Sequence, residues 1–230
     1  MRQLTLPLAW PDQATFENFL VSKNNSTLFA CLQNFIQNVG EKYIYLYGTG
    51  GVGVSHLLYA ACHAIQAGAG TAMYIPLKKT GLSPHLLDGL EDLTLICWDD
   101  VESICDESST GWQEALFHCY NRTQTTNVRL LVAGHAPPHQ IKWQLPDLGS
   151  RLSSGAVFAV HELSDAEKIT ALQLGAKKRG LALSNEVGVY LLKYYPRDMH
   201  HLFDALDQLD QSSLVAQRRL TIPFVKEILG

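Results

Sequence analysis

The sequence is poor in charged residues, and this scarcity excludes several classes of protein. Charged residues make up 17% of the 230 positions and hydrophobic residues 47%, whereas about 25% are charged in an average soluble protein. Intrinsically disordered chains have the opposite balance, so we expect a folded chain of one large or two small domains. The 22 acidic and 18 basic residues give a net charge of −4. Proteins that act mainly by binding phosphate backbones are usually basic, so sequence-independent DNA binding is disfavoured.

Cysteine pairs with disulfide or metal-binding spacing are also missing. The five cysteines are an odd number and include no C-x-x-C pair, so the sequence predicts neither a disulfide framework nor a zinc site. The N-terminus carries Pro7 and Pro11 where a signal peptide needs an uninterrupted apolar helix. The most apolar stretch, residues 57–77, is broken by His63, Gln66 and glycines, so it does not predict a membrane span. We therefore expect a cytoplasmic protein without zinc and without a membrane segment.

Hydrophobic patterns divide the chain into an α/β part and a helical part. Apolar runs typical of buried strands alternate with helical periodicity through residues 12–162, which predicts a parallel sheet with helices on both faces. From residue 163 to residue 230 only helical periodicity remains, which predicts a small all-α domain. Residues 1–11 precede both parts as an extended tail. The expected strands are 43–47, 71–75, 93–98, 128–133 and 157–160, and the expected helices are 27–39, 55–66, 112–120, 165–180, 185–195, 198–209 and 223–229.

A glycine-rich loop between the first strand and its helix has the spacing of a phosphate-binding loop. Residues 48–55 read G-T-G-G-V-G-V-S and fit the pattern G-x-x-x-x-G-x-S. In such loops glycines let backbone N–H groups surround phosphates, a lysine neutralises the β/γ oxygens, and a serine holds Mg²⁺. Val54 occupies the lysine position, and a glycine-rich turn without a ligand is the alternative interpretation. The nucleotide-contacting residues expected in this loop are Gly48, Gly50, Gly51, Val52, Gly53, Val54 and Ser55.

Two aspartates follow the apolar run at 93–98. A carboxylate at the end of a buried strand beside a phosphate loop is where Mg²⁺ is bound in nucleotide-hydrolysing proteins. We expect Asp99 to hold Mg²⁺ together with Ser55 when a nucleotide is present. The alternative is that Asp99 or Asp100 caps the following segment.

Taken together, these features resemble the AAA+ module of the bacterial replication initiator DnaA. The chain resembles the Hda family of DnaA-related regulatory inactivators still more closely. Both resemblances together cover nearly the whole chain and imply an AAA+ α/β core with a helical lid over residues 163–230. The residues that carry them are 15–19, Asn24, Asn25, 48–55, Asp99, Asp100, 120–122, 130–133, 145–152 and 220–229.

The N-terminal tail is similar to a peptide that binds the DNA polymerase III β sliding clamp. Its sequence Q-L-T-L-P-L, residues 3–8, matches the type Q-L-x-L-P-L. An extended segment of this kind inserts leucines into an apolar pocket and uses the glutamine amide for directional hydrogen bonds. An apolar arm packed on its own domain is the alternative. The clamp-binding residues implied are Gln3, Leu4, Leu6, Pro7 and Leu8.

The resemblance also implies what the chain does not carry. DnaA continues beyond its lid into a helix-turn-helix domain that reads DNA, whereas this sequence ends at Gly230, directly after the lid helices. We therefore expect no DNA-reading domain, and the cluster Lys177-Lys178-Arg179 suits a solvated helix end. Assembly into a homo-oligomer is compatible with an AAA+ module.

Three positions that face phosphates in the family depart from its pattern. Val54 replaces the loop lysine, His135 falls near the polar sensor after the fourth strand, and His200 aligns with the lid arginine that touches the nucleotide. Each lost charge-assisted contact costs about 1–3 kcal/mol. Two such losses weaken affinity by roughly 10²–10⁴. We therefore expect weakened binding of nucleotide, with ADP as the family's habitual ligand, and little ATP hydrolysis by this chain.

Arg151, in the segment Ser150-Arg151-Leu152, keeps the family's pattern. It matches the AAA+ arginine finger, which stabilises the γ-phosphate of a neighbouring subunit during hydrolysis. A surface arginine in a loop salt bridge is the alternative. The resulting hypothesis is a clamp-tethered negative regulator of replication initiation that triggers ATP hydrolysis by ATP-bound DnaA. Two competing hypotheses are an autonomous AAA+ ATPase of the helicase-loader type and a non-catalytic DnaA-binding scaffold.

Overall fold

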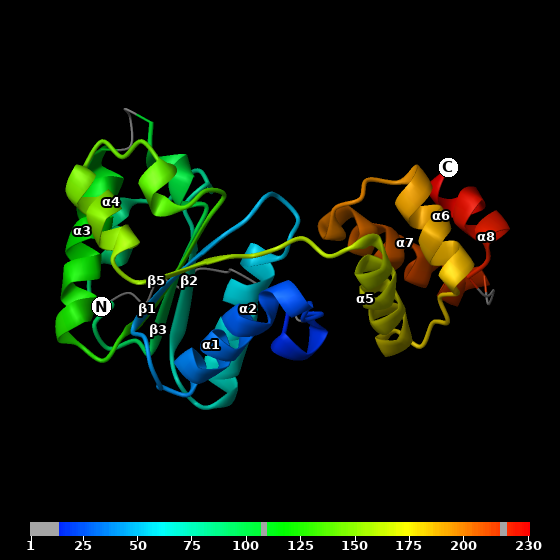
Figure 1. Cartoon of the computed structure of the whole chain (residues 1–230), viewed down its shortest axis with the longest axis horizontal. Helices are drawn as coiled ribbons and strands as arrows, with labels where there is room; N and C mark the ends of the chain where they lie inside the picture. Colours follow the sequence, from blue (N-terminus) through cyan, green and yellow to red (C-terminus); the bar gives the residue numbers. More distant parts are fainter. Residues whose placement is uncertain (1–13, 107–109, 217–219) are drawn as a thin grey trace.

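The computed structural model describes residues 14–106, 110–216 and 220–230. The predicted clamp-binding tail, residues 1–11, lies outside these ranges. A five-stranded parallel sheet has the order β2-β3-β4-β1-β5 and forms the centre of the α/β part (Figure 1). The strands are β1 (Tyr43–Tyr47), β2 (Ala72–Pro76), β3 (Leu95–Asp99), β4 (Arg129–Gly134) and β5 (Ala156–Ala159).

Strand β1 lies between β4 and β5 although it comes first in the chain. Ile44 is paired with Leu131 on one side and with Ala156 on the other. The strand order therefore reverses beside β1, and in open α/β sheets ligands bind outside the carboxyl ends of the strands at such a reversal. The loop that follows β1 is the glycine-rich loop of the sequence.

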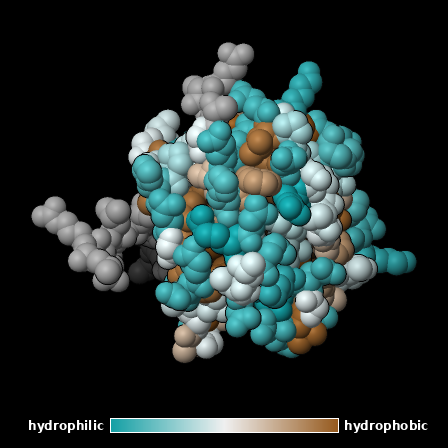
Figure 2. Space-filling view, turned by 90° about the vertical axis from the view of Figure 1, so that its left-hand side faces the viewer, coloured by the Kyte–Doolittle hydropathy of each residue, from teal (hydrophilic) through white to brown (hydrophobic). Residues whose placement is uncertain are grey.

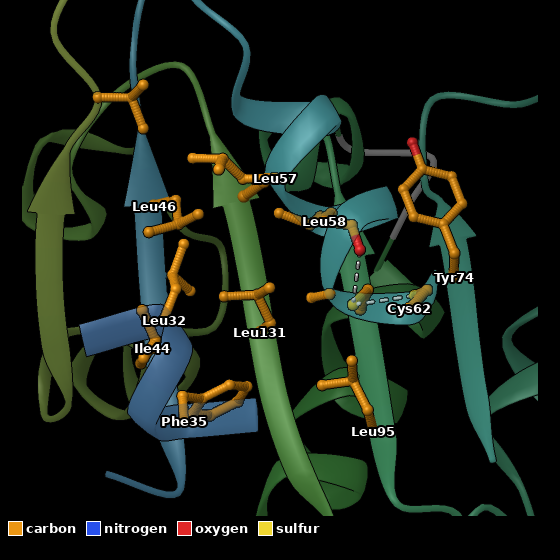
Figure 3. Packing of buried hydrophobic residues seen from close by; sticks show 14 of the residues in the cluster. Leu32, Phe35, Ile44, Leu46, Leu57, Leu58, Cys62, Tyr74, Leu95 and Leu131 are labelled. Carbon is orange, nitrogen blue, oxygen red and sulfur yellow. Dashed lines mark hydrogen bonds between the residues drawn. The ribbon is translucent and has the colours of Figure 1, made fainter. Parts of the chain in front are cut away.

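Two helices cover one face of the sheet: α1 (Ser26–Ile36) and α2 (Val54–Ala67). Alternate strand residues such as Ile44, Leu46 and Leu131 point towards this face and pack against Leu32 of α1 and Leu57 of α2 (Figure 3). All five side chains are fully buried. Burial of one aliphatic side chain of this size contributes about 1.5–3 kcal/mol to folding stability. Because β1 and α2 both belong to this layer, it fixes the two ends of the glycine-rich loop that joins them.

The opposite face is covered by α3 (Thr110–Thr125) and α4 (Pro146–Ser153). Its tyrosines are buried but keep hydrogen bonds, as buried polar groups require. The Tyr43 hydroxyl donates to the carbonyl of Leu152 at 2.8 Å, and the Tyr45 hydroxyl donates to the carbonyl of Ala136 at 3.0 Å. The side of the molecule that carries these two helices is mostly hydrophilic, with hydrophobic residues in small groups (Figure 2).

The C-terminal part consists of α5 (Asp165–Lys178), α6 (Asn185–Tyr194), α7 (Met199–Ala216) and α8 (Ile222–Leu229). These helices form a core of their own, which includes Leu172, Leu191, Leu206 and Phe224. Helix α5 starts with a capping box in which Ser164 and Glu167 exchange backbone and side-chain hydrogen bonds. In Figure 1 this helical part lies beside the sheet domain and follows one extended strand-to-helix connection.

Polar contacts hold this connection in place. The side-chain amide of Asn25, which is fully buried, donates to the carbonyl of His161 and accepts from its N–H, both at 2.8 Å. Lys168, 3% exposed, pairs with Glu162. The ammonium of Lys178 donates to the carbonyl of Glu17 at 3.1 Å. The start of the chain's described part thus contacts the connection before α5 at His161 and the last turn of α5 at Lys178.

The predicted α/β class, with helices on both faces and a helical lid, is confirmed. The domain boundary after residue 162 stays a prediction. Helix α4 was not predicted as a helix, so Arg151 lies in a helix and not in a loop. Within the described residues no helix combines the length and apolarity that a membrane crossing needs. Single-turn helices occupy Phe16–Asn18, Lys23–Asn25, Pro84–Leu87, Val101–Ile104 and Pro138–Gln140.

Candidate functional site

The glycine-rich loop connects β1 to α2 and has the backbone shape that its glycines allow. Gly51 and Gly53 have φ angles of 81° and 100°, in the left-handed region that side chains disfavour. Gly53 is the N-cap of α2, so the helix N-terminus begins directly at the loop. The backbone arrangement that binds anions at a helix start is therefore kept. Ser55 lies in the first turn of α2.

Two valine side chains and a carbonyl group pack closely around Gly48 at the start of the loop. A methyl group built on Gly48 would lie 2.6 Å from Cγ2 of Val52, 2.9 Å from the carbonyl oxygen of Val160 and 3.3 Å from Cγ2 of Val54. Val54 also packs against the core under α1 and α2. The position that carries a lysine ammonium in phosphate-binding loops therefore carries a packed methyl group here.

The N-terminal segment covers the end of the loop. A methyl group on Gly53 would lie 3.0 Å from the ring of Phe19, which stacks on Phe29 and lies 5.7 Å from the ring of His56. Nε2 of His56 is 2.9 Å from the carbonyl oxygen of Thr15. Sequence reasoning did not assign Phe19 to the site, because its contact with the loop depends on packing between distant segments.

Asp99 lies at the end of β3, buried at 4% exposure, with both carboxylate oxygens hydrogen-bonded. The Tyr74 hydroxyl donates to Oδ2 at 2.6 Å, and the backbone N–H of Asp100 donates to Oδ1 at 2.9 Å. Burial and the neighbouring Asp99 charge raise the pKa of Tyr74, so this hydroxyl stays a donor. Asp100 has a φ of 55°, and burial followed by the Asp99 charge raises the pKa of its carboxyl.

The residue after β4, His135, lies within a small acidic group. Its Nδ1 is 3.7 Å from Glu102 and 3.9 Å from Asp100, and Glu102 accepts the backbone N–H groups of His135 and Ala136. Oε2 of Glu102 is buried without a hydrogen bond among the described residues. Sequence reasoning missed Glu102, although its position two residues after Asp100 was the available signal.

A pocket of about 440 Å³ opens beside the loop at the carboxyl ends of β1, β4 and β5. It is the place where a ligand of a parallel α/β sheet is expected. Its lining includes Tyr47, Thr49, His135, Gln140, His161 and Glu162.

On the lid side, Asp198 and not His200 contacts the loop. A methyl group on Gly51 would lie 2.5 Å from Cβ of Asp198. The carboxylate of Asp198 also binds Nδ1 of His201 at 2.7 Å. His200 is largely exposed and lies 3.5 Å from Asp204 on the same helix. The structure thus brings Gly51 and Asp198 together, and it directs the His200 imidazole to a neighbouring carboxylate.

Arg151 lies in the last turn of α4 and is exposed. No ion pair or hydrogen bond of its guanidinium occurs within the part of the chain that the structure describes. Its helix is fixed from both sides, since Leu148 and Leu152 are fully buried and Gly149 packs directly against the ring of Trp143. Among the described residues, the guanidinium is therefore an unpaired cation on a rigid support.

Magnesium has two candidate protein ligands, Ser55 and Asp99. Within residues 14–106, 110–216 and 220–230, no cluster of three or more His, Cys, Asp or Glu side chains is arranged to hold a metal ion. Mg²⁺ in nucleotide sites takes one or two protein ligands and completes its shell with phosphates and water. The polar groups at Ser55 and Asp99 fit such a secondary role. Val54, which supplies no cation, and the Asp198 carboxylate at Gly51 weaken the fit to a phosphate chain.

Two family models match the chain. The model of the Hda lid domain matches residues 165–229, and the model of the bacterial DnaA ATPase domain matches residues 11–80. The first covers the helical part, and the second covers the glycine-rich loop and its flanking elements.

Solved structures of DnaA have the same fold. Domain III of the Thermotoga maritima replication initiation protein DnaA has a TM-score of 0.79 at 19% identity, over 95% of this chain and 96% of that one. AMPPCP-bound DnaA from Aquifex aeolicus has a TM-score of 0.74 at 22% identity, over 89% of this chain and 67% of that one. The Thermotoga maritima RuvB Holliday junction branch migration motor has a TM-score of 0.71 at 13% identity, over 94% and 71% of the two chains. The chain is therefore similar to the Hda family over its helical part, similar to the bacterial DnaA ATPase domain over residues 11–80, and shares the AAA+ fold of DnaA domain III.

Proposed function

We propose that this chain is a regulatory inactivator of DnaA that limits replication initiation. In this proposal the tail of residues 3–8 binds the DNA-loaded polymerase III β sliding clamp. The AAA+ surface then contacts ATP-bound DnaA, and Arg151 stimulates hydrolysis of the ATP that DnaA carries. The protein would act in the cytoplasm and reach the nucleoid through the clamp.

The observation that supports the proposal most is the contrast between Arg151 and the chain's own loop. Arg151 is exposed, has no partner among the described residues and stands on a packed helix. A guanidinium stays charged at every physiological pH and stabilises the charge that develops on a γ-phosphate. The loop, by contrast, has Val54 at its cation position and Asp198 against Gly51. This combination suits a protein that acts on a neighbour's nucleotide.

The residues of the chain's own glycine-rich loop would bind a nucleotide weakly. Ser55 and Asp99 would contribute to Mg²⁺ binding, and the backbone N–H groups at the start of α2 would bind phosphate oxygens of ADP. The loop has no lysine that neutralises phosphate charge. The Mg²⁺ that accompanies a bound nucleotide would supply this neutralisation. The residues present provide few groups for hydrolysis, so little ATPase activity is expected from this chain alone.

The test is ATP hydrolysis by DnaA in the presence of clamp loaded on DNA. Wild-type chain should stimulate hydrolysis, and Arg151→Ala should lose that stimulation by roughly 10³-fold or more, as for other trans-acting fingers. Arg151→Lys keeps the charge but not the planar fork and should recover only a small part. Lys142→Ala, which removes an exposed cation close to the same helix, is the matched control and should stimulate normally.

Two outcomes would contradict the proposal. Full stimulation by Arg151→Ala would favour a DnaA-binding scaffold without a catalytic arginine. Substantial ATP hydrolysis by the chain alone, abolished by Asp99→Ala, would favour an autonomous ATPase.

The tail is tested separately by clamp pull-down. Gln3→Ala combined with Leu6→Ala should abolish retention on immobilised clamp and leave the melting temperature unchanged. Retention of this double variant would show that the tail does not bind the clamp.

A further inference from the structure

Asp198 links the lid to the glycine-rich loop. It precedes α7, and its Cβ occupies the space directly above Gly51, where an added methyl group would lie 2.5 Å away. Cγ and Oδ1 of Asp198 would both lie 3.2 Å from that methyl group. Only a glycine with a φ of 81° permits this approach. The contact therefore places a carboxylate against the loop that the family uses for phosphate.

Helix capping explains only part of this arrangement. The backbone N–H of His201 donates to Oδ1 of Asp198 at 3.1 Å, which is an N-cap hydrogen bond for α7. A helix cap requires a polar side chain, but it does not require that this side chain contact another domain. Asparagine and serine cap helices about as well as aspartate, so capping does not account for a negative charge at Gly51.

The groups around this contact favour the Asp198 carboxylate and not a bound phosphate. Burial opposes ionisation of Asp198, but the hydrogen bonds from the backbone and imidazole of His201 outweigh it and lower the pKa of the carboxyl. Nδ1 of the His201 imidazole lies 2.7 Å from this carboxylate and is already engaged by it. His200 faces Asp204. Val54 contributes no charge to the loop.

We propose that Asp198 is a specificity-determining residue that excludes nucleotide phosphates from the glycine-rich loop and holds the lid against the core in their place. This inference deepens the nucleotide part of the proposed function and rests on it. The carboxylate next to Gly51 opposes a phosphate chain at this loop, by the volume that it occupies and by its charge. A nucleotide therefore binds only after α7 moves away from the loop, and an unliganded lid stays docked.

The experiment measures binding of a fluorescent ADP analogue with Mg²⁺ to the full chain by anisotropy titration. Asp198→Asn keeps the cap and nearly the same volume but removes the charge, and it should tighten binding about tenfold or more. Asp198→Ser keeps the cap and also removes volume, so it should tighten binding further. Asp204→Asn removes a carboxylate from the same helix away from the loop and is the matched control.

The proposal is overturned if both Asp198 variants bind the analogue no more tightly than the wild type. It is also overturned if Asp204→Asn gives an equal gain, since the effect would then reflect general charge. This titration contains neither DnaA nor clamp, so its failure leaves the arginine-finger test of Arg151 untouched. Conversely, an inactive Arg151 would leave the measured affinities of the Asp198 variants valid.

Discussion

Gly51 is constrained twice, once by its own backbone and once by its neighbour. Its φ of 81° disfavours any side chain, and Asp198 occupies the space where a side chain would begin. Gly48 and Gly53 have similar close neighbours in Val52 and Phe19. Gly50 differs, since no atom lies within 4 Å of a methyl group built on it. Three of the four loop glycines thus serve the packing of this protein, whatever ligand the loop binds.

This difference predicts opposite outcomes for two neighbouring substitutions. Gly51→Ala should lower the free energy of unfolding by about 2 kcal/mol or more, because the left-handed backbone and the Asp198 contact both oppose the methyl group. Gly50→Ala should change it by no more than about 0.5 kcal/mol. Urea denaturation of both variants measures the difference. Equal stability of the two would contradict the described loop conformation.

At the level of elements, the first turn of α2 is held by a segment that precedes α1. Phe19 covers the loop end, and His56 of α2 contacts the carbonyl of Thr15. Burial lowers the pKa of His56 from its ordinary value of 6.5, the Thr15 carbonyl partly opposes this, and His63 and Lys178 lower it further. The folded protein therefore holds this imidazole neutral more firmly than the unfolded chain does.

Stability should fall at mildly acidic pH because of His56. Below about pH 6.5 the unfolded chain binds a proton that the folded protein still resists, so the free energy of unfolding decreases as the pH falls through this range. His56→Gln stays neutral throughout and should show a smaller decline between about pH 7.5 and pH 5.5, measured by urea midpoints. His85→Gln, at a site with a largely exposed side chain, is the control and should decline as the wild type does. An undiminished decline in His56→Gln would exclude this role.

Across the whole molecule, one buried amide joins the start of the described chain to the connection between sheet domain and lid. Asn25 binds both backbone groups of His161, a residue far away in the chain. Lys178 of the lid and Glu17 of the N-terminal segment add a second link at the C-terminal end of α5. The N-terminal segment thus contributes to the relative placement of core and lid.

Loss of the Asn25 amide should therefore weaken the molecule as a whole. Asn25→Ala removes the two hydrogen bonds that the buried Asn25 amide makes to the backbone of His161, which should cost about 1–3 kcal/mol in unfolding free energy. Amide hydrogen exchange at His161 should also become faster. The exposed Asn34→Ala on α1 is the control and should alter neither quantity. Unchanged exchange at His161 would show that the two hydrogen bonds do not hold this connection.

Much of the fold was predictable because buried strands and helices leave strong local patterns. All five strands and seven of the helices coincide with expected segments, although α3 and α7 extend five and seven residues beyond their expected ends. Helix α4 was not predicted, since it is short and begins at Pro146 without an extended apolar repeat. The contacts of Asp198 with Gly51 and of Phe19 with Gly53 could not be predicted either, because they join segments that are distant in sequence. The loop motif could be predicted because its residues are consecutive in the sequence. The residues that surround the loop come from distant segments, so their positions could not be predicted.

The strand order has a consequence for synthesis of the chain on the ribosome. Strand β1 emerges first among the strands, yet both of its partners are made last: Ile44 pairs with Leu131 and Ala156. At synthesis rates of about 5–20 residues per second, roughly 5 to 20 s pass between synthesis of β1 and of β5. Until β4 is made, this apolar strand has neither neighbour beside it, and until β5 is made one of its edges stays unpaired; such segments are prone to aggregate. We expect the nascent chain to require chaperone protection until β5 has left the ribosome.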